Sequence, residues 1–205
     1  MAFSLLDFTG YAATSISLTS SLNPLFSRDE FKQMEADAQD DTRLERVDGY
    51  IYAMAGAGLA HERAVARTLV TLAPAAAAAH GCEVYSSNRR LSIGEHTDVL
   101  PDVSAYCDPG DVDEYAGYRP CLVVEVLSPS TALNDLNLKV PRYQQVESIE
   151  TILLINTDPP YAGVFTRDGA GWAREHVGGD GAVIKLTCPP CEMQLATLVV
   201  PNSPE

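Results

Sequence analysis

The sequence predicts a mixed α/β (α+β) domain in which helices flank one mixed central β-sheet. Helix-like and strand-like segments alternate along the chain in the order helix, strands, helix, strands, helix, strands. The continuous apolar run CLVVEVL, residues 121–127, suits a central strand covered on both faces. With 205 residues, of which 46% are hydrophobic, the chain can bury one sizeable core. We expect a partly disordered N-terminal extension at 1–24 and a single domain at 25–200.

The first predicted elements are a helix and a β-hairpin. Ser27 has the position of an N-cap, and Glu30 follows three residues later, which is the pattern of a capping box. The segment LERVDGYIYAMA, residues 44–55, alternates around Asp48-Gly49, a dipeptide typical of two-residue hairpin turns. A helix from Ser27 and a hairpin centred on Asp48-Gly49 are therefore expected.

A long helix and a series of short strands come next. Apolar and small residues recur at helical spacing within 56–81, and Pro74 is expected to break or kink this helix. Strand-like runs follow at 82–86, 89–93, 99–106 and 121–127.

The last third of the chain combines one more helix with further strands. Residues 131–146 have a helical pattern that Pro141 interrupts. TILLIN at 151–156 is a second buried strand, and residues 162–177 alternate around Asp168-Gly169 as an exposed hairpin.

Charge and hydropathy limit the functions that are open to the chain. The formal net charge of -14 argues against loose adhesion to nucleic acid or anionic membrane, although it permits a local metal-dependent site. The first cationic side chain is Arg28, so the start lacks the basic region of a signal peptide, and no apolar run reaches membrane-spanning length. We expect a cytoplasmic protein with no membrane partner.

The cysteines allow more than one interpretation. There are five, an odd number, spread through a chain large enough to have its own core, so a disulfide scaffold is not expected. Cys188-Pro-Pro-Cys191 has the spacing of a redox or zinc motif, but a second such pair is absent. The favoured interpretation of this segment is a turn between two strands in the C-terminal part of the chain.

Two acids on consecutive strands are the candidates for a metal site. Asp102 precedes the alternating run VSAY, and Glu125 lies inside the apolar run 121–127. A buried carboxylate needs a partner, and strands joined by a turn-rich connection can pair side by side. We therefore expect Asp102 and Glu125 to hold one hard cation such as Mg²⁺. The alternative for Glu125 is a pair with Arg89 or Arg90.

Lys139 is the third candidate catalytic residue. It lies on the helix predicted after the turn SPST, from which it can be directed back to the end of the strand that holds Glu125. A lysine there can orient a water or offset charge in a phosphoryl transition state. The alternative is a solvated helix lysine.

These residues resemble the PD-(D/E)xK nuclease superfamily, through Pro101-Asp102, Glu125 and a nearby lysine. The usual lysine position holds Leu127, so Lys139 corresponds to the variant with the lysine on the next helix. The chain more closely resembles the Uma-type restriction endonuclease family. It shares with that family, in order, ERVDGYI (45–51), LAHER (59–63), LPDVSAY (100–106), LVVEVLSPST (122–131) and the set Asp135, Lys139 and Tyr143.

The resemblance covers roughly residues 25–198 and implies a restriction-endonuclease-like fold with Mg²⁺ or Mn²⁺ at the site. It implies lesser roles for Glu45, as an accessory ligand or a structural hydrogen-bonding group, and for His61, as a site residue or a polar cap. Asp135, Tyr143 and Gln144 are expected to be ordinary polar surface rather than support for the lysine helix. DNA is the expected substrate, and a homodimer would suit cleavage of two strands.

Two other classes of function stay open at this point. The chain could keep the nuclease fold as an inactive binding or dimerisation module, which a salt bridge that closes Glu125 off from solvent would favour. It could also be a zinc or redox protein built on Cys188 and Cys191.

Overall fold

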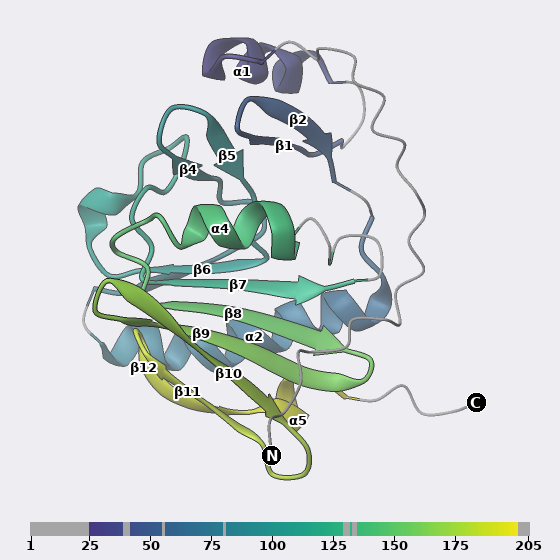
Figure 1. Cartoon of the computed structure of the whole chain (residues 1–205), viewed down its shortest axis with the longest axis vertical. Helices are drawn as coiled ribbons and strands as arrows, with labels where there is room; N and C mark the ends of the chain where they lie inside the picture. The colour runs from purple at the N-terminus through teal and green to yellow at the C-terminus, as the bar shows by residue number, and fades with distance from the viewer. Residues whose placement is uncertain are drawn as a thin grey trace.

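The computed structural model describes residues 25–38, 42–54, 56–79, 81–128, 132 and 135–200, and Figure 1 shows the whole chain. The expected extension at 1–24 lies outside the described residues. None of the helices in the described part is long and apolar enough to cross a membrane.

A mixed six-stranded sheet forms the centre of the fold, with the strand order β10-β9-β8-β7-β6-β3. β7 and β8 pair in parallel, and the other neighbours pair antiparallel. The strands are β3 (Glu83–Ser86), β6 (Val103–Tyr106), β7 (Leu122–Leu127), β8 (Thr151–Thr157), β9 (Pro160–Asp168) and β10 (Gly171–Gly178). All residues of β7 are buried, as its continuous apolar run predicts.

The expectation of a single sheet was wrong, because the described residues also form a four-stranded sheet, β2-β1-β5-β4, and a two-stranded sheet, β11-β12. The additional strands are β1 (Leu44–Val47), β2 (Tyr50–Ala53), β4 (Leu91–Ile93), β5 (Thr97–Val99), β11 (Val183–Thr187) and β12 (Pro190–Gln194). The run 99–106, read as one strand, passes from β5 in one sheet to β6 in the other. Pro101 lies at this break, where it has no N–H to give to a ladder.

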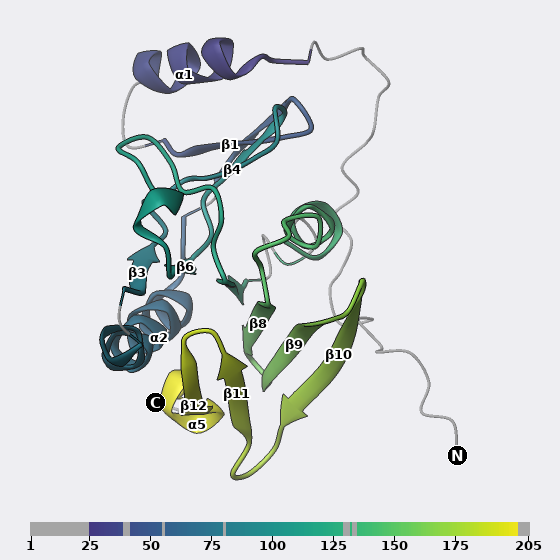
Figure 2. The same ribbon diagram turned by 90° about the vertical axis from the view of Figure 1, so that its left-hand side faces the viewer.

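The helices cover both faces of the central sheet, as Figure 2 shows. α2 (Leu59–Ala78), α5 (Leu195–Leu198) and the β11-β12 hairpin pack on one face. The short helix α4 (Val140–Tyr143) and the four-stranded sheet pack on the other. The sheet therefore separates two apolar cores.

The first helix and the hairpins confirm the capping and turn signals in the sequence. α1 (Arg28–Asp37) begins with the capping box formed by Ser27 and Glu30. The first hairpin turns at Asp48-Gly49, and both residues have positive φ, as a two-residue turn of this kind requires. The hairpin formed by β9 and β10 also lies where it was expected.

The two prolines in predicted helices have different effects. Pro74 was expected to break or kink the long helix, but α2 continues past it to Ala78. The helix before Pro141 is different, because a π-helical turn, η2 (Asp135–Lys139), precedes α4. Pro141 cannot donate the next helical hydrogen bond, so the hydrogen-bond pattern changes close to this position.

The cysteines correct the sequence-based expectation. Within the described residues, disulfides join Cys82 to Cys107 and Cys121 to Cys188. Cys188 starts the turn between β11 and β12, which confirms the turn, but it does not pair with Cys191. The short connection η1 (Pro109–Asp111) follows Cys107.

Candidate active site

The pairing of β6 with β7 brings Asp102 and Glu125 to the same place. Val103 lies opposite Val124 in the antiparallel ladder, so one step further Asp102 lies opposite Glu125. Residues opposite each other in a sheet extend their side chains from the same face. Both side chains are buried, with exposed fractions of 7% for Asp102 and 2% for Glu125.

Lys139 is the partner that the buried Glu125 required. Its Nζ lies 3.3 Å from Glu125 Oε1, 3.0 Å from Glu45 Oε1 and 3.3 Å from Asp135 Oδ1. Lys139 is itself only 6% exposed. The alternative partners for Glu125, Arg89 and Arg90, are directed elsewhere: Arg90 pairs with Glu35, and Arg89 bonds the Asp113 carbonyl.

The spacing of four residues explains why one helical face supplies several members of the site. Residues four apart lie above one another on a helix, so Asp135, Lys139 and Tyr143 share a face. Tyr143 is fully buried and its hydroxyl donates to Glu125 Oε1 at 2.5 Å. Asp135 is 2% exposed. The expectation that Asp135 and Tyr143 are polar surface was therefore wrong.

Glu45 and His61 reach the site from other elements. Glu45 comes from β1, and its Oε1 also accepts the backbone N–H of Leu100 at 2.7 Å. His61, in the first turn of α2, places Nε2 3.0 Å from Asp102 Oδ2, which also accepts the Val126 N–H at 2.7 Å. Within the described residues His61 Nδ1 makes no hydrogen bond.

Burial and charge shift the pKa values in this cluster. Burial raises the pKa of Glu125 well above its ordinary value, while the charge of Lys139 opposes that rise. Burial alone would lower the pKa of Lys139, but the charges of Glu125, Glu45 and Asp135 outweigh it and raise the pKa well above normal. These directions fit a cluster with more carboxylates than cations. Lys139 stays protonated, and Glu125 is difficult to ionise.

The pKa values of two neighbours follow the same causes. Burial, and then the charges of Glu125 and Glu45, raise the pKa of Tyr143 well above its ordinary value, so its hydroxyl stays a donor. Burial would lower the pKa of His61, but its hydrogen bond to Asp102 and the nearby acids raise it overall.

A cavity of about 100 Å³ gives access to this cluster. The two metal-ligand candidates, Asp102 and Glu125, line it together with Lys139. Its wall also includes Arg43, Glu45, His61, Glu62, Ser128 and Asp135. The residues that the sequence singled out therefore meet at one cavity, and Arg43 is an addition that carries no sequence signal of its own.

Comparison with known proteins places the chain in a family. The model of the Uma2 family, described as a putative restriction endonuclease, matches residues 28–197. The chain belongs to the Uma2 family. It is 34% identical over 151 residues to an uncharacterized protein, slr1290, of Synechocystis sp., covering 72% of this chain and 77% of that protein. A second Synechocystis protein, sll1609, is 31% identical over 131 residues, covering 62% and 72% of the two chains.

A solved structure confirms the fold of this Uma2 protein. A protein from Anabaena variabilis ATCC 29413, described as a putative nuclease belonging to DUF820, superimposes with a TM-score of 0.69 over 84% of this chain and 97% of that chain. The sequence identity is 15%, so the likeness concerns the fold. The restriction-endonuclease-like fold expected from the sequence is thereby confirmed.

The donor set of the Uma2 site fits a hard divalent cation. Carboxylate oxygens are the ligands that Mg²⁺ and Mn²⁺ prefer. When ionised, Glu45, Asp102, Glu125 and Asp135 carry four negative charges, and Lys139 carries one positive charge. A divalent cation would offset part of this excess. Asp102 and Glu125 lie opposite each other where β6 and β7 pair, so their carboxylates extend from the same face of the sheet.

Proposed function

We propose that this Uma2 protein is a metal-dependent endonuclease that hydrolyses phosphodiester bonds, with DNA as its substrate and Mg²⁺ or Mn²⁺ as its cofactor. Asp102 and Glu125 would hold the ion, and Lys139 would act beside it. When bound, the ion supplies Lewis acidity toward the phosphate oxygens. Glu45 and His61 would assist from the edges of the site.

The observation that carries this proposal is the convergence of Asp102, Glu125 and Lys139 on one cavity with an excess of carboxylates. A fold that needed only stability would do better with apolar side chains, because burying several charges costs more than it returns. Charged clusters of this kind concentrate at functional sites. The Uma2 match supports the same assignment.

Lys139 acts as a cation and a hydrogen-bond donor rather than as a general base. Its pKa is raised well above normal by the carboxylates that contact it, which keeps the ammonium group protonated. In hydrolysis, a water oxygen forms a bond to phosphorus while the bond to the leaving oxygen breaks; the water gives up a proton to the solvent, and the leaving oxygen takes one up. A fixed ammonium group can orient that water and stabilise the charge that develops on the phosphate.

Nucleic acid and this protein are both negatively charged, so binding needs a local cation. The net charge of -14 opposes binding of nucleic acid at long range. Arg43, in the wall of the cavity, donates hydrogen bonds to Ser87 Oγ at 3.0 Å and to Asn88 Oδ1 at 3.4 Å, which orient its guanidinium. It is the residue we assign to contact with a substrate phosphate, where arginine offers two parallel donors.

Cleavage of plasmid DNA tests this function. The wild-type protein should nick supercoiled plasmid with Mn²⁺ or Mg²⁺ and lose the activity with a chelator. Asp102→Asn and Lys139→Met should each lose at least about 100-fold in rate, comparable to the removal of one electrostatic catalytic group. Glu175→Gln, a change at an exposed carboxylate on β10, is the matched control and should retain full activity. Wild-type activity in Asp102→Asn and Lys139→Met, with no activity in a mock preparation that lacks the protein, would refute the assignment.

A second function is favoured by the ion pair itself. Glu125 is 2% exposed and is held by Lys139 and Tyr143, which is the arrangement expected of an inactive binding or dimerisation module. In that case wild-type protein would bind DNA or itself without cleaving, and added Mn²⁺ would change neither property.

A further inference from the structure

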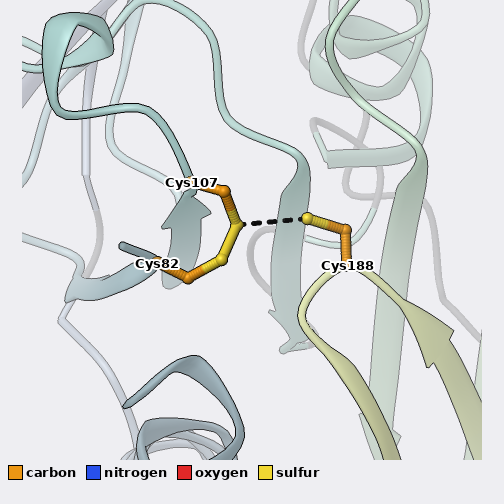
Figure 3. A group of neighbouring side chains, drawn as sticks. All are labelled: Cys82, Cys107 and Cys188. Carbon is orange, nitrogen blue, oxygen red and sulfur yellow. Dashed lines mark hydrogen bonds between the residues drawn. A yellow bond between two sulfur atoms is a disulfide. The ribbon is translucent and has the colours of Figure 1, made fainter. Parts of the chain in front are cut away.

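A second group of chemically active side chains lies at the opposite end of the central strands. Cys82, Cys107, Cys121 and Cys188 bring their sulfur atoms together there, and Figure 3 shows three of them. Cys107 Sγ is 3.3 Å from Cys188 Sγ and 3.6 Å from Cys121 Sγ. The sulfur atoms of Cys82, Cys107 and Cys188 all lie within 4.8 Å of one another.

Strand pairing brings these four cysteines together. The β3-β6 ladder pairs Glu83 with Tyr106, so Cys82 lies opposite Cys107 one step further. Cys121 directly precedes β7, and its N–H donates to the Ala105 carbonyl on β6. Cys188 reaches the group from the turn between β11 and β12. Three separate hairpin or ladder ends therefore converge on one point.

This group is distinct from the proposed nuclease site. Asp102 precedes β6 and Cys107 follows it, so the length of the strand separates the two, about 16 Å at roughly 3.3 Å per residue. The donors also differ in kind, because thiolates are soft ligands that select zinc, whereas the carboxylates of the first site select hard cations.

We propose that the reduced chain binds one Zn²⁺ ion through Cys82, Cys107, Cys121 and Cys188. In a tetrahedral site with Zn–S bonds of about 2.3 Å, the sulfur atoms are about 3.8 Å apart. The 3.3 Å and 3.6 Å separations around Cys107 lie close to that spacing. Cys121 is buried, and the other three are half-buried at the margin of the core, which is suitable for a closed structural site.

The chemistry requires a reductant, because the structure holds the four residues as disulfides. A phosphine reduces each disulfide by two electrons to two thiols and becomes a phosphine oxide with an oxygen from water. Binding of Zn²⁺ by the resulting four thiols releases up to four protons, as ligation of thiolates does. The oxidised and zinc-bound forms thus exclude each other.

The test uses the full chain, reduced with a phosphine and titrated with Zn²⁺ against a chromophoric chelator. One ion per chain should bind through the cysteines, and Co²⁺ at the same site should give the visible absorption of a tetrahedral thiolate complex. Cys107→Ser and Cys82→Ser should each weaken the binding by more than about 100-fold, since loss of even an outer partner of a ligand costs roughly 10–100-fold. Circular dichroism checks that both variants are folded.

Two controls make the outcome decisive. Cys191→Ser removes the cysteine that is unpaired among the described residues and should bind zinc as the wild type does. Asp102→Asn should also bind zinc normally, so failure of this proposal and failure of the proposed nuclease site are distinguishable. Absence of zinc binding by the reduced wild type, or wild-type affinity in Cys107→Ser, would overturn the proposal.

Discussion

Replacement of Lys139 by methionine tests how the buried carboxylates are held. Methionine keeps most of the apolar stem of lysine and removes its charge. In the wild type, Nζ contacts Glu45, Glu125 and Asp135 at 3.0–3.3 Å, and all four side chains are buried. The variant leaves these carboxylates without the cation that offsets them.

The expected cost is large because the site is closed to water. Breaking a buried ion pair by removal of one partner costs about 3–5 kcal/mol. For a chain of this length each kcal/mol lowers the midpoint of thermal unfolding by about 2–4 °C, so the midpoint should fall by roughly 6–20 °C. The loss should shrink as the pH falls, because burial raises the pKa of Glu125 and its protonation removes part of the uncompensated negative charge.

The assays are thermal unfolding, for the midpoint, and urea unfolding, for the free energy, of metal-free protein at neutral pH, both followed by circular dichroism. Lys185→Met is the matched control, because Lys185 pairs with Glu192 on the surface with exposed side-chain fractions of 76% and 66%. That change should alter the free energy of unfolding by no more than about 1 kcal/mol. A Lys139→Met variant as stable as Lys185→Met would refute the reasoning about the buried cluster.

Two further substitutions probe the supports of the site. Tyr143→Phe removes the buried hydroxyl that donates to Glu125. It should lower the free energy of unfolding, measured in urea titrations, by about 1.5–3 kcal/mol. An unchanged free energy of unfolding would contradict the hydrogen bond. Arg142 bonds Asp48 and lowers the pKa of that carboxyl, mainly through the hydrogen bond. Arg142→Gln should therefore lower the free energy of unfolding by about 0.2–1 kcal/mol, as expected for an exposed pair. Because the folded-state pKa of Asp48 is depressed, this gap between wild type and variant should be complete above pH ~4. It should disappear as the pH falls through the folded-state pKa. A gap that does not change as the pH falls from neutral into the acid range would contradict this assignment.

Local signals in the sequence were sufficient where a few neighbouring residues decide the structure. The turn at Asp48-Gly49 depends on two residues that accept positive φ, and the start of α1 depends on Ser27 and Glu30. The pairing of Asp102 with Glu125 was also accessible, because consecutive strands in a sheet are usually neighbours.

The remaining features depend on contacts between distant parts of the chain. Burial of Asp135 and Tyr143 requires the helix to pack over β7, although their spacing from Lys139 was visible in the sequence. The division into several sheets depends on where the chain leaves β5 at Pro101. The meeting of Cys82 with Cys107 depends on the register between β3 and β6, which cysteine spacing does not reveal.

Calorimetric titration of Mn²⁺ into metal-free protein tests the central claim most directly, because it requires no knowledge of the substrate. Wild type and Glu175→Gln should bind one ion at this site, and Asp102→Asn should lose that binding while it unfolds with the same cooperativity. Binding of Mn²⁺ by Asp102→Asn with wild-type affinity would contradict the account and place the metal, if any, elsewhere.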